Sequence, residues 1–170
     1  MTLEEALTGK EIPVEIRKEL LLVDVPYFSF DGEVKIGQLI VHQDLGREVK
    51  AIFKKLLEMK FPIERMVPVV EYGWDDEVSM AANNTSAFNY RLNYSNPNKM
   101  SRHAFGRAID INPVLNPFVK EEIIAPQGAA YDPNISGTIT EKIAKLFEKE
   151  GWIWGGRWTD QKDWQHFEKS

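Results

Sequence analysis

Two of the three histidines in the chain lie in densely polar segments that also contain acidic residues, and these two segments hold the clearest candidates for chemistry. His103 precedes Asp110 by seven positions, and His166 follows Asp163 by three. Zinc binds imidazole nitrogen and carboxylate oxygen, and a catalytic zinc site has three protein ligands and one open position. His103, Asp110 and His166 are therefore candidate ligands of one zinc ion. Such a ligand set leaves the ion a net charge of about +1, which lowers the pKa of a bound water toward about 7.

Two further side chains are candidates for the same site. Asp163 is near enough to His166 to share the site without binding the metal, and we expect it to be the general base. A tetrahedral oxyanion also needs a positive partner beside the metal. Arg91, which ends the run 88–91, is the candidate for that role.

The spacing by itself leaves other interpretations open. H-x6-D and D-x-x-H both occur by chance, so the two histidines could be hydrogen-bonded without any metal. Two histidines and one carboxylate also suit iron in a facial triad. We expect the third histidine, His42, to be a structural or surface residue. Trp164, between the candidate base and the ligand His166, either packs in the core or forms a wall of the cleft.

Segment 101–110 resembles a known family. It carries the complete S-x-H-x-x-G-x-A-x-D signature of the zinc-dependent D-alanyl-D-alanine carboxypeptidases and dipeptidases and L-alanyl-D-glutamate endopeptidases, which are VanY-like and phage-endolysin-like peptidoglycan peptidases. The family's second motif, an acidic residue followed after two positions by histidine, is similar to Asp163–His166. Segment 83–91 resembles the one that delivers the family's arginine, and the whole resemblance runs from about 37 to 167. The fixed positions of the signature are Ser101, His103, Gly106, Ala108 and Asp110.

The resemblance implies zinc held by His103, Asp110 and His166, with Asp163 as the catalytic base. It also implies that Arg91 polarises the scissile carbonyl and holds the oxyanion. Some members use glutamate as the base, and the shorter aspartate favours the endolysin-like branch. The implied partner is a peptidoglycan stem peptide or muropeptide, cut by a carboxypeptidase or an endopeptidase.

Ser101 and the overall activity each have a second interpretation. Ser101 either hydrogen-bonds the substrate or fixes its own loop. The alternative to an enzyme is a non-catalytic, zinc-containing module that binds cell-wall peptides, and a complete signature with a base argues against it. A metal-dependent hydrolase of another substrate is the third possibility.

The predicted order of helices and strands indicates a single α+β domain with a small antiparallel sheet flanked by helices. The resemblance implies a hedgehog/DD-peptidase-like fold. A capping box at Thr2 and Glu5 starts a short helix, and an apolar run from 20 to 23 opens a strand. The mixed order of elements favours α+β over a doubly wound sheet. We divide the chain into an N-terminal extension, 1–36, and a zinc peptidase domain, 37–170, within one compact unit. The remaining predicted strands are 34–42, 63–70, 87–92 and 107–111, and the predicted helices are 45–60 and 139–149.

Composition excludes several classes of protein. The chain has 170 residues, a net charge of −5 and no cysteine, which excludes disulfide frameworks and thiolate chemistry. The mild acidity argues against nucleic acid as a partner. No apolar stretch approaches the roughly 18 residues of a membrane-spanning helix. We also expect the protein to be a monomer. No signal peptide is visible at the N-terminus, so the protein is either cytoplasmic until release or exported with a signal outside this sequence.

Overall fold

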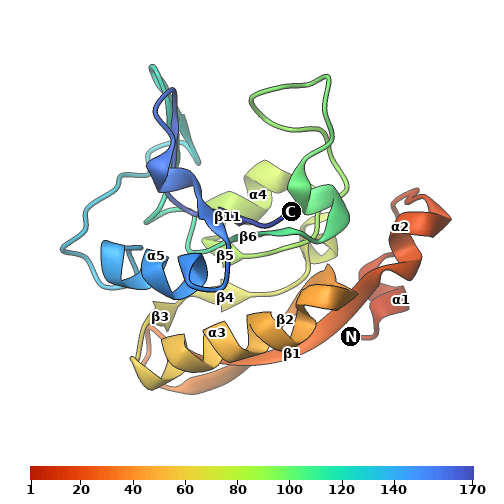
Figure 1. The fold of residues 1–170 in the computed structure, drawn as a ribbon, viewed down its shortest axis with the longest axis horizontal. Helices are drawn as coiled ribbons and strands as arrows, with labels where there is room; N and C mark the ends of the chain where they lie inside the picture. The colour runs from red at the N-terminus through yellow and green to blue at the C-terminus, as the bar shows by residue number, and fades with distance from the viewer.

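The computed structural model describes residues 1–170, and its most regular part is a long hairpin covered by one helix. Strands β1 (Leu20–Ser29) and β2 (Val34–His42) pair antiparallel, from Leu20 opposite His42 to Phe28 opposite Val34. Helix α3 (Gly46–Glu58) lies along this hairpin (Figure 1). One face of α3 is apolar at helical spacing, and this face is buried. The buried apolar residues of that face are Val49, Ile52, Phe53 and Leu56.

All other strands have only two or three residues and form small sheets. β3 (Pro62–Ile63) joins the hairpin by parallel pairing with β1, and β4 (Arg65–Met66) pairs parallel with β5 (Asn84–Thr85). Two more sheets have the strand orders β6-β11-β9 and β10-β7-β8. Their strands are β6 (Ala108–Asp110), β7 (Phe118–Lys120), β8 (Ile123–Ala125), β9 (Ile153–Trp154), β10 (Lys162–Asp163) and β11 (His166–Glu168).

The remaining helices are short. Thr2 and Glu5 form the expected capping box at the start of α1. No helix has the length and apolar character needed to cross a membrane. The α-helices are α1 (Leu3–Ala6), α2 (Val14–Lys18), α4 (Asp76–Ala81) and α5 (Glu141–Glu148), and the 3-10 turns are η1 (Gln43–Leu45), η2 (Val69–Tyr72), η3 (Arg102–Phe105) and η4 (Gly155–Arg157).

One main core joins the hairpin layer to the short strands. Phe147 on α5 stacks on Phe167 of β11 at 3.9 Å between ring centroids and meets Phe53 of α3 edge-on at 6.3 Å. Trp152 and Trp154 are both buried in the same cluster. The strand that carries His166 is therefore fixed by aromatic packing against the hairpin layer.

The observed fold confirms a mixed α+β domain, but with several small sheets in place of one. Strand 34–42 and the helices predicted at 45–60 and 139–149 are present, each helix one to two residues shorter at its ends. The strand predicted at 63–70 is wrong, because the chain turns between β3 and β4 and becomes helical after Pro68. The division at residue 36 stays a prediction, and β1 pairs with β2 across it.

Candidate metal centre

The loop that carries His103 is fixed at both of its ends. Ser101 caps η3, with its Oγ accepting from the main-chain N of His103 at 3.2 Å. Gly106 ends the turn at φ +66° and lies directly on β2, where its carbonyl accepts from the N of His42 at 2.8 Å. A Cβ at Gly106 would lie 2.5 Å from that nitrogen, so only glycine allows this approach. The loop is thereby anchored to the hairpin.

Strand pairing brings the other two candidate ligands together. Asp110 on β6 lies directly opposite His166 on β11 in the antiparallel register. Side chains of directly opposite residues share a face of the sheet and lie about 5 Å apart at Cβ. Residues 56 positions apart in sequence thus become neighbours, next to the fixed loop of His103.

The three side chains converge on one buried point. His103 Nε2 lies 3.1 Å from Asp110 Oδ2, and His166 Nδ1 lies 2.9 Å from Asp110 Oδ1. The two imidazole nitrogens are 3.2 Å apart. All three residues are buried, and one ligand atom from each lies within 4.8 Å of the others. The group could hold a metal ion.

The outer ring nitrogens show that this donor set fits a divalent metal ion such as zinc. His103 Nδ1 contacts the carbonyl of Ala87 at 2.5 Å, and His166 Nε2 contacts the carboxylate of Glu168 at 3.1 Å. Both outer partners are acceptors, so each neutral ring carries its proton outward and turns a lone pair inward. Two inward lone pairs and a carboxylate repel one another unless a cation lies between them. Such outer-shell partners are typical of zinc-bound histidines.

The pKa values of two candidate ligands, Asp110 and His166, indicate the same need for positive charge. Burial raises the pKa of Asp110, but the charge and hydrogen bond of His103 and the hydrogen bond of His166 outweigh it and hold that pKa far below its usual range. Burial lowers the pKa of His166, yet hydrogen bonds to Asp110 and Glu168 raise it to about 10. Without a cation, the site would therefore recover positive charge by protonating His166.

Asp163 lies in the same cleft but outside the ligand group. It is at the end of β10, and its Oδ1 is buried without a hydrogen-bond partner. Burial, together with the charges of Asp110 and Asp76, raises its pKa to about 7, against the attraction of His166 and Arg91. Gly155 packs against it so closely that a Cβ there would lie 2.8 Å from the Cβ of Asp163. The carboxyl is thus held in place and is close to half-ionised at neutral pH.

Arg91 reaches the cleft from an extended segment. Its Nε lies 3.0 Å from Oδ2 of Asp76 on α4, and an Nη donates to the carbonyl of Leu92 at 3.2 Å. The strand predicted at 87–92 is wrong. The main chain there follows the loop of His103 instead, with Asn89 N donating to His103 O and Ser101 N donating to Arg91 O.

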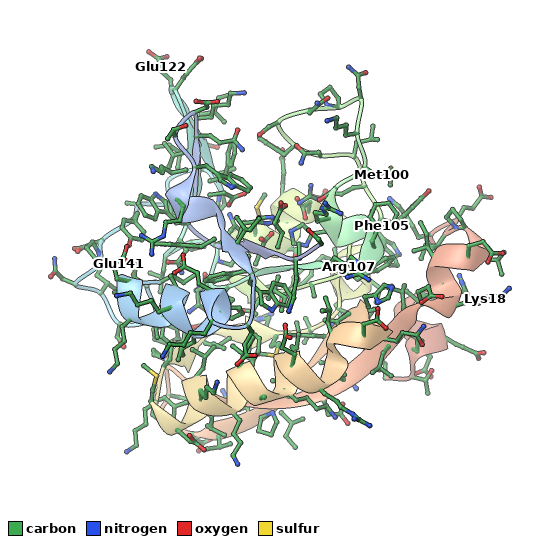
Figure 2. The ribbon with its side chains drawn as sticks, viewed as in Figure 1. Lys18, Met100, Phe105, Arg107, Glu122 and Glu141 are labelled. Carbon is green, nitrogen blue, oxygen red and sulfur yellow. The ribbon has the colours of Figure 1, made fainter.

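All six residues singled out from the sequence line one cleft: Arg91, Ser101, His103, Asp110, Asp163 and His166. The loop 93–100 reaches across it to the facing sheet, where Tyr94 meets Phe118 at 5.2 Å between centroids and Ser95 Oγ donates to Gln161 Oε1 at 2.7 Å. Figure 2 shows Met100 at the base of this loop and Glu122 at the tip of the β7–β8 hairpin, on two segments that project from the body of the protein.

Sequence reasoning missed four residues of the site. Asp76 holds Arg91, while Trp158 and Gln165 line the cleft and Glu168 holds His166. Glu168 could have been found, since it lies two positions after His166 on a strand and so shares its face. The cleft-wall interpretation of Trp164 is wrong, because that ring stacks on Tyr131 at 3.8 Å and packs on the core.

His42 stays outside the metal group, as expected. It lies at the end of β2, next to Glu19, Asp44 and Arg107. Its imidazole Nδ1 accepts from the main-chain N of Asp44 at 3.3 Å, as a local cap of η1. The residue has a structural role at the end of the hairpin.

Comparison with known proteins supports the family that the motifs indicated. Residues 95–169 match a family model described as D-alanyl-D-alanine carboxypeptidase. This segment contains Ser101, the three candidate ligands and Asp163, while Arg91 precedes it. The chain has no match among curated proteins or among solved structures. The match thus confirms the resemblance to the VanY-like peptidases for the part of the chain that carries the ligands.

Proposed function

We propose that this protein is a zinc peptidase that hydrolyses a peptide bond in peptidoglycan stem peptides, on a hedgehog/DD-peptidase-like fold. The observation that carries the proposal is the convergence of His103, Asp110 and His166 beside an unpaired buried carboxylate in one cleft. The family match supports this substrate class. The bond is either the terminal D-alanyl-D-alanine bond or the L-alanyl-D-glutamate bond, and the expected partner is a stem peptide or muropeptide bound by a monomer, with no role for nucleic acid.

His103, Asp110 and His166 would hold the zinc ion. When bound there, zinc supplies a Lewis acid that activates water and polarises a carbonyl. Asp163 accepts a proton from the attacking water at its carboxylate and then donates it to the leaving amine. A base works best when its pKa is near the operating pH. Burial raises the pKa of Asp163 to about 7 in the absence of zinc, and a bound cation would lower it from there.

Arg91 and Ser101 act on the substrate. The ion pair with Asp76 fixes the Nε side of the guanidinium, and the N–H groups left over can donate to the carbonyl oxygen as negative charge develops on it. The Oγ of Ser101 accepts from His103 N and still carries its own proton, which can be donated to the bound peptide. Both residues line the cleft next to the ligands.

Mass spectrometry of peptidoglycan fragments incubated with zinc-loaded protein tests the proposal. We expect new fragments that identify the bond cut, abolished by EDTA and restored by zinc. Asp163→Asn should retain zinc, measured by elemental analysis, and should lower turnover roughly 10²–10⁴-fold. Turnover like that of the wild type in this variant would refute the role of the base. Binding of stem peptides with no fragment released would identify the non-catalytic module instead.

A further inference from the structure

Buried polar atoms without a partner gather at the cleft. Six buried side-chain atoms in the protein make no hydrogen bond, and three of them belong to residues that line the cleft: Arg91 Nε, Asp163 Oδ1 and Gln165 Oε1. The first lies beside the Asp76 carboxylate, and the second belongs to the proposed base. Only Gln165 has neither a charged partner nor a part in the chemistry described so far.

Gln165 lies between the base and a ligand on the turn from β10 to β11. Its main chain is fixed, because its carbonyl accepts from the N of Ile111 at 3.1 Å. The residue is only 2% exposed, and its side chain lines the cleft together with His103 and His166. No hydrogen bond from its amide to the rest of the chain exists, although a buried unpaired carbonyl costs free energy and native proteins rarely leave one unexplained.

Most buried structural amides of the same protein are fully bonded, and Asn89, whose Oδ1 is also unpaired, still donates through its Nδ2 to Asp76. Asn112 accepts from Glu64 N and donates to two carbonyls, and the Nδ2 of Asn116 has three carbonyl partners. Asn84 likewise accepts from Val67 N and donates twice. These amides are as buried as Gln165 and hold loops together. Gln165 differs from all of them, because its side-chain amide makes no hydrogen bond at all and lines the cleft.

We infer that Gln165 is a substrate-binding residue whose side-chain amide pairs with a main-chain amide of the peptide bound across the metal ligands. The inference rests on the proposed function and adds a contact within it. The unpaired atom is an acceptor, so it calls for an N–H donor, which a peptide amide offers and a terminal carboxylate does not. A carboxamide in addition offers a donor to the adjacent peptide carbonyl. Gln165 thereby fixes the position of the peptide relative to Asp163 and His166.

Replacement of the amide tests the contact. In Gln165→Leu, which keeps the length and removes both polar atoms, we expect kcat/KM for a stem peptide to fall about tenfold, mainly through KM, with zinc content unchanged. Gln43→Leu is the matched control, since Gln43 is exposed at the start of η1 and contacts Glu19. Calorimetry should show the same roughly tenfold loss of affinity for the uncleaved peptide when Gln165→Leu is added to Asp163→Asn.

An ester scan identifies the partner atom and protects the test against a misfolded variant. Synthetic stem peptides with one non-scissile N–H replaced by ester oxygen should include one that the wild type cleaves about tenfold less efficiently. Gln165→Leu should show no further loss with that peptide. If the leucine variant does not fold, the wild-type scan remains decisive, because no sensitive N–H would overturn the inference.

The two proposals fail in different ways. A wild-type protein that cleaves no stem peptide defeats the proposed function. Cleavage by the wild type that Gln165→Leu leaves intact, with only its thermal stability altered, defeats the inference alone and assigns a bound water as the partner of the amide.

Discussion

Two regions of this protein are stabilised in different ways. The hairpin layer consists of β1, β2 and α3, and the metal region consists of the short strands and loops around the candidate ligands. In the first, β1, β2 and α3 are nine to thirteen residues long, and apolar side chains fill their inner faces. In the second, no strand exceeds three residues, and buried polar side chains such as Asn84, Asn112 and Asn116 hold the loops by hydrogen bonds. The family match begins only at residue 95 and so falls on the second region. Regular packing supplies the support, and irregular chain held by amides positions the reacting groups.

Removal of a ligand should have the largest effect, confined to the metal region. In His166→Ala, we expect loss of zinc and a fall in peptidase activity on the order of 10³-fold or more, because the Lewis acid is lost. The hairpin core does not contain this side chain, so the far-UV circular dichroism should be retained. Elemental analysis and a peptide assay check both halves. Full zinc occupancy in the variant would contradict the ligand assignment.

Loss of a buried aromatic ring in the hairpin layer should lower the stability of the protein and leave its activity nearly unchanged. Phe53 is 1% exposed and meets Phe147 edge-on. Phe53→Ala should lower the free energy of unfolding by about 3–5 kcal/mol, measured by urea denaturation, because it leaves a cavity. The kcat of the folded protein should stay within about twofold of the wild type, since no cleft residue is removed. A large fall in kcat at full folding would break the separation between the two regions.

Within the metal region, a change at a residue that contacts a candidate ligand should have a smaller effect than loss of the ligand itself. Glu168 accepts from His166 Nε2 and orients that ring. Glu168→Gln should weaken zinc affinity about 10- to 100-fold, measured by competition with a chelator, and leave stability nearly unchanged. Glu121→Gln, at an exposed position on the β7–β8 turn, is the control for loss of one negative charge.

The smallest expected effect is a shift in the titration of Asp163. Burial raises its pKa to about 7 in the metal-free protein, above about 3.9 for unfolded aspartate. Folding therefore favours the protonated form, and this contribution to stability is lost as pH rises from about 4 to about 7. A zinc ion nearby favours the carboxylate, so it should lower the pKa by about one unit or more. Infrared difference spectra against Asp163→Asn, with and without zinc, measure the shift, and identical titrations would contradict the placement of Asp163 beside the metal.

The two regions also differ in how far the sequence predicts them. The helix expected at 45–60 and the strand at 34–42 are present, because long amphipathic patterns dominate local structure. The strand expected at 63–70 fails, because tertiary contacts decide the path of so short a segment. Asn84 accepts from Val67 N, and Asn112 accepts from Glu64 N, so bonds to distant amides replace a continuous ladder there.

The candidate site also contains residues that the sequence predicts and residues that only the fold reveals. His103, Asp110, Asp163 and His166 come from motifs whose residue types fit metal chemistry, and the structure brings them into one cleft. Asp76 carries no comparable signal, because its pairing with Arg91 depends on where α4 lies in three dimensions. Trp158 and Trp164 are the same residue type six positions apart, and only the fold determines that the first residue lines the cleft while the second stacks on Tyr131.

The contact between Gly106 and β2 has a thermodynamic consequence. It is a main-chain joint between the regular layer and the loop of the first ligand, and it has no room for a side chain. Fraying of the hairpin end at His42 would release that loop, and with it His103, one of the three candidate metal ligands. A metal ion bound only when this loop is in place would therefore also oppose local opening of the hairpin end, because a ligand stabilises the form that binds it.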